Sequence, residues 1–229
     1  MIIFIFLITL LLFLWIRKTF FWDAPKGMTL FIGAPGSGKT TLCAYFVRRF
    51  NKKRKNKGRN VYSNVPILKS KKIVPNEDLG RYLVEDGEVI IDEGGIEFNN
   101  RKFKTLSPDI IKFAKLYRHY GITNFLFFSQ GMDIDITFVR LCDRICLVRK
   151  SYLPYFVCVK EVRKFIGIDD LTKQLIDQYE FKFLGKHLIF APLCWKMFDT
   201  YETPFLPSKS FEEWNNISRF ILPEDKISS

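Results

Sequence analysis

The sequence predicts an α/β protein in which helices flank a mostly parallel central sheet. Short apolar runs recur along the chain and alternate with helical patterns. A strand that is covered on both faces of a parallel sheet has such a continuous apolar run. In addition, a glycine-rich stretch lies between one apolar run, residues 28–32, and a helical pattern over residues 41–50. A chain of 229 residues can form one sizeable domain with small additions.

The glycine-rich stretch matches the phosphate-binding pattern G-x-x-x-x-G-K-[ST]. It consists of Gly33, Ala34, Pro35, Gly36, Ser37, Gly38, Lys39 and Thr40, and Thr41 follows it. Glycines let the backbone turn its N–H groups inward, and these groups form a positive anion site together with the helix N-terminus. We expect residues 33–41 to bind ATP, with Lys39 on the β- and γ-phosphates and the Thr40 hydroxyl on Mg²⁺.

A second motif is the acidic pair Asp92-Glu93, which follows the apolar run Glu88–Ile91. We expect that run to be a buried parallel strand. Asp92 would then hold Mg²⁺, directly or through water. Glu93 would polarise the attacking water as a general base. The alternative is a surface turn, because Gly94-Gly95 comes next.

A polar residue ends another predicted strand. Ser107-Pro108-Asp109 favours a helix start, an apolar stripe continues this helix to Tyr120, and Gly121 suits a C-cap. The run Ile122–Ser129 then predicts a buried strand that Gln130 follows. Ligands bind at the carboxyl ends of strands in open α/β sheets. Gln130 could therefore sense the γ-phosphate, or it could be an ordinary polar residue at a strand end.

The remaining elements follow from apolar runs and helical spacing. Further strands are predicted at Asn60–Val65, Arg144–Arg149, Tyr155–Lys160 and Lys186–Ala191, the last two as antiparallel additions. Loops are predicted at Lys69–Val74 and Asn99–Lys104. A helix is predicted over Ile168–Tyr179, whose apolar residues share one helical side: Leu171, Leu175, Ile176 and Tyr179.

Basic residues dominate the charge balance. The chain has 36 Lys and Arg against 24 Asp and Glu, a net charge of +12, which argues for DNA or an anionic membrane surface as a partner. A dense basic run ends the first predicted domain helix: Arg48, Arg49, Lys52, Lys53, Arg54, Lys55, Lys57 and Arg59. This run could grip nucleic-acid phosphates or lipid headgroups, or it could be a solvated loop. Five cysteines without a C-x-x-C pair argue against a zinc site.

The first residues, Met1–Ile16, are uncharged and almost wholly apolar. We expect a single-pass membrane anchor, extended to Trp22 if Arg17 and Lys18 reach the interface. A signal peptide and a buried core helix are the alternatives. Positive charges after the run place the bulk of the chain in the cytoplasm. The predicted organisation is a transmembrane anchor at 1–22, a nucleotide-hydrolase domain at 23–203 and a C-terminal tail at 204–229.

Four blocks occur in order: GAPGSGKTT, VIIDE, YRHYGITNFLFFSQ and DITFVRLCDRICLVRK. Together they resemble the Zot-type P-loop ATPases, the family of the filamentous-phage assembly ATPase and of the N-terminal domain of zonula occludens toxin. The resemblance covers about residues 27 to 203, and its RHYG run with the terminal glutamine is typical of the wider FtsK/HerA-like motors.

The resemblance implies a RecA-like core that binds ATP with Mg²⁺. It also implies that subunits assemble into a ring, such as a hexamer. The ring would act on phage or plasmid DNA at a membrane, where phage assembly or secretion proteins are possible partners. The resemblance further implies an arginine that acts in a neighbour's site, for which Arg118, Arg140 and Arg144 are candidates. Here the anchor precedes the domain, whereas in the phage protein it follows. The expected function is ATP-driven DNA translocation in phage assembly; the alternatives are a packaging or conjugative-transfer motor and a nucleotide-switched membrane scaffold.

Overall fold

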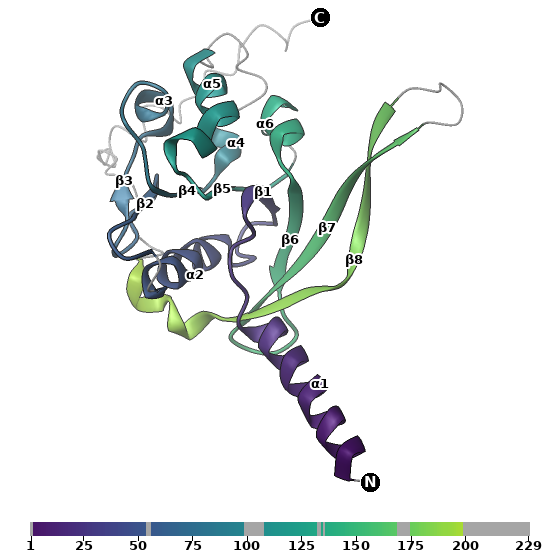
Figure 1. Ribbon diagram of the computed structural model, residues 1–229. Helices are drawn as coiled ribbons and strands as arrows, with labels where there is room; N and C mark the ends of the chain where they lie inside the picture. The colour runs from purple at the N-terminus through teal and green to yellow at the C-terminus, as the bar shows by residue number, and fades with distance from the viewer. Residues whose placement is uncertain are drawn as a thin grey trace, which may run out of the picture. The chain divides into compact units, whose positions relative to one another are not determined.

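The order of the strands places the phosphate-loop strand inside the sheet. The computed structural model describes residues 2–53, 56–98, 108–131, 134, 136–168 and 175–198. Over these residues the sheet has the order β3-β2-β4-β5-β1-β6-β7-β8 (Figure 1). The strands are β1 Gly27–Ile32, β2 Asn60–Ser63, β3 Lys71–Lys72, β4 Gly87–Ile91, β5 Asn124–Ser129, β6 Arg144–Lys150, β7 Phe156–Ile168 and β8 Leu175–Phe190.

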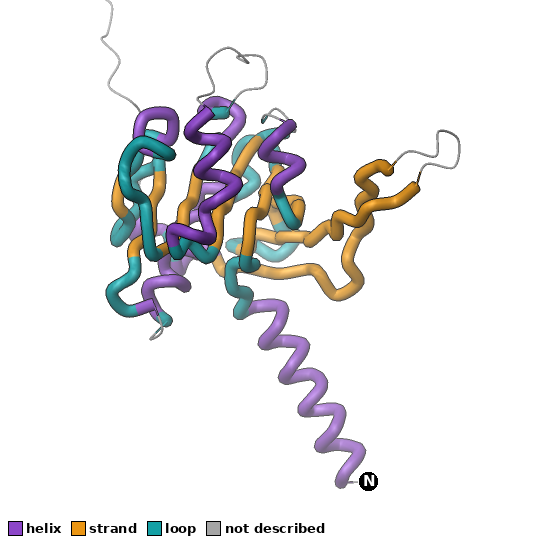
Figure 2. Tube along the Cα trace, turned by 45° about the horizontal axis from the view of Figure 1, so that its top comes forward, coloured by secondary structure: helices purple, strands orange, loops and turns teal. Residues whose placement is uncertain are grey.

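The helices connect these strands and cover both faces of the sheet. They are α1 Ile2–Phe20, α2 Lys39–Lys52, α3 Pro75–Asp78, α4 Gly94–Glu97, α5 Pro108–Leu116 and α6 Ile136–Leu141, with 3₁₀ turns η3 Tyr117–Tyr120, η4 Ala191–Leu193 and η5 Trp195–Met197. α2 lies on one face, and α5 and α6 lie on the other (Figures 1 and 2).

The parallel part of the sheet runs from β3 to β6, and β5 is inserted between β1 and β4. β7 and β8 extend it in antiparallel pairing. The predicted mostly parallel sheet with flanking helices is thus confirmed, and it fits an α/β RecA-like nucleotide hydrolase. Because β1, β5 and β4 are parallel neighbours, the residues after all three meet at one edge of the sheet.

Two apolar cores explain why the central strands are continuous apolar runs. Phe31 of β1 belongs to the core under α2 and stacks on Phe128 of β5, with 4.5 Å between the ring centroids. Its neighbour Leu30 belongs to the core under α5 and α6, where Phe127 contacts Phe138 of α6. Alternate residues of a strand point to opposite faces, so a strand covered on both faces needs apolar residues at every position.

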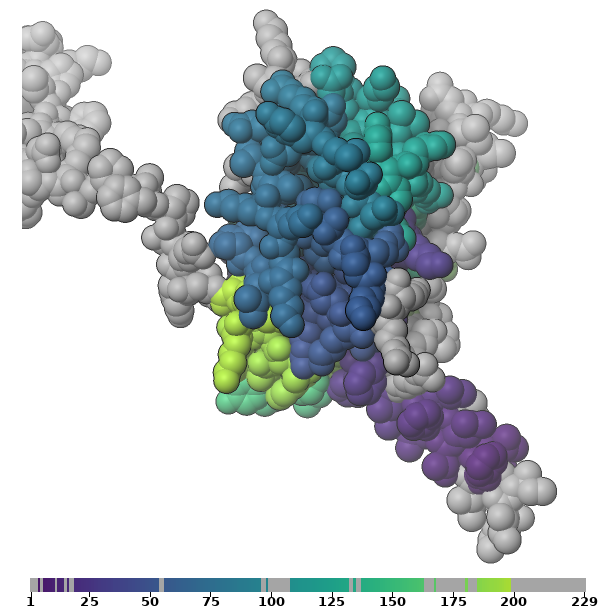
Figure 3. Space-filling view, turned by 60° about the vertical axis from the view of Figure 1, so that its left-hand side comes forward, coloured from purple at the N-terminus to yellow at the C-terminus, as the bar shows by residue number. Residues whose placement is uncertain are grey.

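The segment of η4 and η5 returns the chain to the α2 face. Ala191 and Cys194 belong to the core beneath α2, and Figure 3 shows this segment beside α2. The Leu68 amide donates to the Met197 carbonyl at 2.8 Å. The segment Ala191–Met197 therefore packs back on the core beneath α2.

The helix predicted over Ile168–Tyr179 is wrong. β7 extends to Ile168, β8 begins at Leu175, and the two strands pair as an antiparallel hairpin from Phe156↔Phe190 to Ile168↔Leu175. Residues 179–183 alternate apolar and polar types, the period of a strand. Strand pairing overrides the local helical spacing here.

Smaller departures concern short elements. The loop predicted over Lys69–Val74 contains β3, which pairs in parallel with β2 through Tyr62↔Lys71. The helix from Pro108 ends at Leu116, and a 3₁₀ turn completes the segment up to Gly121, whose φ of 72° confirms the predicted C-cap. The loop predicted at Asn99–Lys104 and the tail 204–229 lie outside the described residues.

Helix α1 has 19 residues, and its described side chains from Phe4 to Ile16 are exposed and, apart from Thr9, apolar. In the described part of the chain, no helix combines the length and the apolarity needed to cross a membrane. That finding does not support the spanning helix predicted at residues 1–22. Packing holds the end of α1 against the sheet, because Phe20 contacts Phe156 at 5.8 Å between ring centroids.

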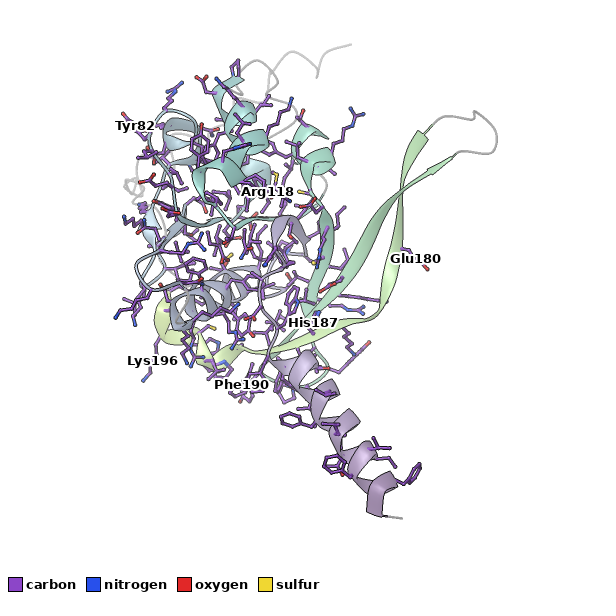
Figure 4. The ribbon with its side chains drawn as sticks, in the orientation of Figure 1. Tyr82, Arg118, Glu180, His187, Phe190 and Lys196 are labelled. Carbon is purple, nitrogen blue, oxygen red and sulfur yellow. The ribbon has the colours of Figure 1, made fainter. Side chains whose placement is uncertain are left out.

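A stacked pair continues this junction between the end of α1 and the sheet. The Trp22 ring lies parallel to that of His187 on β8, 4.2 Å away, and Figure 4 labels His187 and Phe190 on this strand. The buried His187 Nε2 lies 3.0 Å from the Glu161 carboxylate of β7. Trp22 thereby joins the segment after α1 to both antiparallel strands.

Candidate nucleotide-binding site

The phosphate loop joins the end of β1 to the start of α2, as predicted. The Gly33 amide donates to the Ser129 carbonyl of β5 at 3.1 Å, and the Ser37 amide donates to the Ala34 carbonyl at 3.1 Å. The loop then enters α2 through Gly38, whose φ of 99° is in the left-handed region that favours glycine. The hydrogen bond to Ser129 fixes the base of the loop to the neighbouring strand.

Two glycines of the loop are required by close approach, and one of them, Gly38, also has a positive φ. A Cβ on Gly33 would lie 2.5 Å from the Val148 carbonyl oxygen of β6, and one on Gly38 would lie 2.5 Å from Cγ2 of Val157 on β7. Gly36 also has a positive φ, 70°, but has open space around it. The loop is therefore packed tightly against β6 and β7 on one side and open at its tip.

The Lys39 ammonium lies at the centre of the site. Lys39 is 5% exposed, and its Nζ donates to the Gly33 carbonyl at 3.0 Å and to the Ala34 carbonyl at 3.4 Å. The same Nζ is 3.6 Å from the Glu93 carboxylate. Lys39 is thus held over the inside of the loop, where it can meet phosphate oxygens, as the motif predicts.

Thr40 and Asp92 meet across the gap between α2 and β4. The Thr40 hydroxyl donates to Asp92 Oδ2 at 2.7 Å, and the Glu93 amide donates to the other oxygen, Oδ1, at 3.0 Å. Asp92 is 3% exposed. Burial is the largest effect on its pKa and raises it above the usual value, while the Thr40 hydrogen bond lowers it.

A hydroxyl and a carboxylate at this separation form the hard oxygen set that Mg²⁺ prefers. The two residues expected to hold the metal therefore fit it. Mg²⁺ is usually bound through one or two protein oxygens together with substrate phosphates, so Thr40 and Asp92 need no third protein ligand. In the described residues, no cluster of three or more His, Cys, Asp or Glu side chains suits a metal by itself.

Asn64, which the sequence analysis did not single out, fixes the position of Asp92. Its Oδ1 accepts from the Asp92 amide at 2.8 Å, and its Nδ2 donates to the Asp92 carbonyl at 2.8 Å. Asn64 directly follows β2, the neighbour of β4. The predicted strand Asn60–Val65 included Asn64, whereas β2 ends at Ser63. Asn64 therefore did not stand out as a polar residue after a strand, the signal that identified Gln130.

Glu93 and Gln130 are also brought together. Gln130 Nε2 donates to Glu93 Oε2 at 3.4 Å, while the other oxygen of Glu93 faces Lys39. Glu93 has φ 50° and ψ 45°, a left-handed conformation that is uncommon for a non-glycine residue. Such outliers persist where the surroundings hold them, often at functional sites. Glu93 is thereby positioned between the phosphate loop and the end of β5.

The three candidate arginines lie away from this cluster within the chain. Arg118, labelled in Figure 4, donates from Nε to the Tyr117 hydroxyl at 3.0 Å, and its Nη2 is 3.5 Å from Asp143. The Asp143 carboxylate also accepts from the Met28 amide at the start of β1. Arg140 is in the last turn of α6 and Arg144 begins β6.

The basic run Arg48–Arg59, which begins in the last turns of α2, is partly neutralised by the Asp23 carboxylate. Asp23 accepts from Arg49 at 2.7 Å and pairs with Lys53 at 2.9 Å. Burial opposes the charge of Asp23, but these two cations lower its pKa overall. Arg59 donates to the Gly121 carbonyl and lies over the Phe50 ring. Arg54 and Lys55 lie outside the described residues.

The fold and the site together define a class: an α/β nucleotide-binding protein of the P-loop type. Comparison of the sequence with protein-family models and with curated proteins finds no match. Comparison with solved structures finds the N-terminal domain of zonular occludens toxin from Neisseria meningitidis, with 20% identity, coverage of 69% of this chain and 94% of that one, and a TM-score of 0.48.

A second solved structure is the genome packaging NTPase B204 from Sulfolobus turreted icosahedral virus 2 in complex with ATP-gammaS, with 13% identity, 67% and 97% coverage, and a TM-score of 0.39. A crystal structure of B204, the DNA-packaging ATPase from Sulfolobus turreted icosahedral virus, has 15% identity, 66% and 96% coverage, and a TM-score of 0.38. The zonular occludens toxin domain is from the family that the sequence blocks resemble. At such identities and scores the functional argument rests on the site itself.

Proposed function

We propose that this protein is an ATP hydrolase of the Zot type that couples hydrolysis to DNA translocation in phage assembly. The observation that supports it best is the joint placement of Lys39, Thr40, Asp92 and Glu93, with Thr40 and Asp92 2.7 Å apart and Lys39 and Glu93 3.6 Å apart. Each group has the residue type and the position that phosphoryl transfer to water requires.

The chemistry follows from these contacts. The loop amides and Lys39 bind the phosphates, and Lys39 exchanges its contact with Glu93 for phosphate oxygens, since an ammonium favours the more strongly anionic partner. Glu93 is then free to accept a proton from water, while the hydrogen bond from Gln130 orients the Glu93 carboxylate. Magnesium, when bound at Thr40 and Asp92, neutralises charge that develops on the phosphates. Burial of Asp92 excludes water from that side of the site.

DNA as the partner is supported by the net charge of +12, because basic chains attract polyanions. The pairing of Arg49 and Lys53 with Asp23 reduces the charge that their run offers to phosphates. The deciding measurement is ATP turnover of the detergent-extracted protein, alone and with single- or double-stranded DNA. Stimulation by either DNA supports a motor. Turnover that DNA leaves unchanged contradicts coupling, and absent turnover favours a nucleotide-switched scaffold.

Membrane attachment through α1, with the nucleotide site on the cytoplasmic side, is part of the same proposal. The exposed apolar side chains of α1 support it, because large exposed apolar surfaces mark interaction sites. A cavity of about 400 Å³ also lies at the base of α1, where Ile16 and Phe20 face Arg48 and Lys52. We expect the protein to stay in the membrane fraction after a carbonate wash and a cytoplasmic reporter fused after Ser229 to be active. Release by the wash contradicts insertion.

A further inference from the structure

We propose that a cavity beside the phosphate loop receives the nucleobase, which stacks on Tyr155 with little discrimination between purines. This inference rests on the proposed nucleotide binding and names residues for the part of the nucleotide that the phosphate loop does not reach. The cavity has a volume of about 340 Å³. Its walls come from the loop glycines Gly36 and Gly38 on one side and from Tyr155 and Trp195 on the other.

Position is the first argument. The same cavity touches the loop that binds phosphates and continues away from Lys39 toward the β6–β7 turn. β7 is pressed against the loop, because a Cβ on Gly38 would lie 2.5 Å from Cγ2 of Val157. A nucleotide whose phosphates occupy the loop must place its sugar and base close by, and this cavity adjoins the loop directly.

The aromatic wall is held in place by backbone hydrogen bonds. The Tyr155 carbonyl accepts from the Ala191 amide at 2.8 Å, and the Ser151 amide donates to the Phe156 carbonyl at 3.1 Å. Tyr155 itself has φ 65°, in the left-handed region. A tyrosine pays a steric cost in that region, so the turn must be held by these contacts. The conformation places Tyr155 in the cavity wall.

Exposure of the two rings is the second argument. Tyr155 is 63% exposed and Trp195 is 52% exposed, although their rings are in edge-to-face contact at 5.9 Å. The two rings stand at 68° to each other, and each keeps exposed ring surface next to the phosphate site. Bases stack on such rings with an affinity gain of about 1–3 kcal/mol per base.

Ser37 also lines the cavity, but its hydroxyl is not available to a ligand there. Ser37 is 6% exposed, its hydroxyl oxygen is buried, and a Cβ on Gly33 would lie 2.5 Å from that oxygen. The hydroxyl therefore lies against Gly33 within the loop and does not distinguish the edges of adenine and guanine.

Few other polar groups in the cavity could distinguish one base from another by hydrogen bonding. The Ser151 hydroxyl already accepts from the Leu153 amide at 3.2 Å, and the remaining lining residues are mostly apolar or are lysine. Stacking is tolerant of base identity because every base has a π-face. The cavity therefore fits purine nucleoside triphosphates as a class, with ATP and GTP bound within a few-fold of each other.

The test measures binding of ATP, GTP and inorganic tripolyphosphate to the full-length protein in detergent. Tyr155→Ala is expected to weaken ATP and GTP alike by about tenfold, in line with loss of one stacking contact, and to leave tripolyphosphate unchanged. Tyr155→Phe keeps the ring and should bind all three like the original protein. Tyr152→Ala is the matched control, because Tyr152 is fully exposed on the same turn and does not line the cavity.

The outcomes separate the two levels of the proposal. Unchanged ATP affinity in Tyr155→Ala, with tripolyphosphate still bound, overturns the base site and leaves the phosphate loop intact. An equal loss for ATP and tripolyphosphate means that the variant disturbs the loop, which also overturns stacking. A preference for ATP over GTP above about tenfold, within the range of hydrogen-bonded base recognition, overturns the tolerance. Failure of the original protein to bind tripolyphosphate refutes the proposed function itself.

Discussion

Glu93 is the residue on which the proposed hydrolysis depends most. Its carboxylate is shared between Lys39 and Gln130, and its backbone is in the left-handed region. While one oxygen of Glu93 faces the Lys39 ammonium, that oxygen is not available to a water molecule. The contact therefore ties the activity of the base to the arrival of phosphates on Lys39.

We expect Glu93→Gln to bind ATP but to hydrolyse it at least about 100-fold more slowly, because an amide cannot act as a general base. Lys39→Ala should lose binding as well as turnover, since Lys39 contacts the phosphates directly. Equilibrium binding of ATP and steady-state phosphate release measure the two effects separately. Normal turnover in Glu93→Gln would remove Glu93 from this role.

Glu88 is a buried carboxyl outside the nucleotide site. It lies 1% exposed near the start of β4, and Asn124 Nδ2 donates to one of its oxygens at 3.0 Å. Burial raises the pKa of Glu88 to about 8 from a usual 4.5, against weaker lowering effects from the Asn124 hydrogen bond and Lys53. The folded protein therefore holds a proton on Glu88 that the unfolded chain releases above its ordinary pKa.

Stability should therefore fall as pH rises from about 5 to about 8, because the folded state binds more protons than the unfolded state in this window. The slope from one such proton is at most about 1.4 kcal/mol per pH unit. Glu88→Gln removes the proton and should flatten this part of the pH profile, and its advantage should be largest at pH 8. Urea unfolding of the two proteins at several pH values, followed by tryptophan fluorescence, tests the expectation. Parallel profiles would contradict it.

At the scale of elements, the phosphate loop depends on its contact with β7. Gly38 has both a positive φ and a tight contact with Val157, whereas Gly36 has a positive φ and open space. The left-handed conformation alone costs a non-glycine residue about 1–2 kcal/mol. At Gly38 the steric clash is added to this cost.

Gly38→Ala should consequently weaken nucleotide binding and lower the free energy of unfolding by more than Gly36→Ala, which should cost only about 1–2 kcal/mol. Because both substitutions add one methyl group to the same loop, each serves as the control for the other. Denaturant unfolding and ATP titration of both variants measure the difference. Equal losses would show that the contact with β7 does not matter.

The sequence predicts those elements whose signal is local and long enough. Apolar runs located β1, β4, β5 and β6 because both faces of these strands are buried. The predicted antiparallel strands Tyr155–Lys160 and Lys186–Ala191 are confirmed as parts of β7 and β8. The rest of the hairpin was missed, and a helix was predicted over Ile168–Tyr179, since strand pairing is a long-range property. β3 has only two residues and is defined by its partner β2 rather than by its own composition. The helix α6 has six residues, too few for a clear helical pattern, and was also missed.

The same distinction applies to the site. Lys39, Thr40 and Asp92 were identified because each belongs to a contiguous motif with a chemical requirement at a fixed position. Asn64 acts through the register between β2 and β4, and Glu88 is paired with Asn124 through the register between β4 and β5. No local pattern predicts which residues two strands will bring face to face.

For the whole molecule, the arginines raise the question of assembly. Arg118 lies near the start of β1 through its contact with Asp143, whereas Lys39 follows the end of that strand. An arginine at the opposite end of a strand cannot serve the site of its own chain. If subunits form a ring, however, Arg118 can reach the site of a neighbour.

Mixing two inactive variants tests whether Arg118 acts in the nucleotide site of a neighbouring subunit. Lys39→Ala lacks phosphate binding and Arg118→Ala lacks the candidate trans residue, so mixed rings contain some sites with an intact Lys39 next to an intact Arg118. We expect turnover to reappear in the mixture, up to about a quarter of the original rate for random pairing, in line with complementation of separate parts of a phosphoryl-transfer site. Arg140→Ala and Arg144→Ala repeat the experiment for the other candidates. Full activity of Arg118→Ala alone would exclude Arg118.

The shortness of β3 has a consequence for the protein in a crowded cell. A long, flat strand at the border of a sheet is a template on which another chain can add its own strand, and fibrils grow in this way. β3 borders the parallel part of the sheet with only two residues, Lys71 and Lys72, both exposed. Each copy that approached along this border would bring the same two positive charges. The repulsion between these lysines therefore opposes self-association along this border.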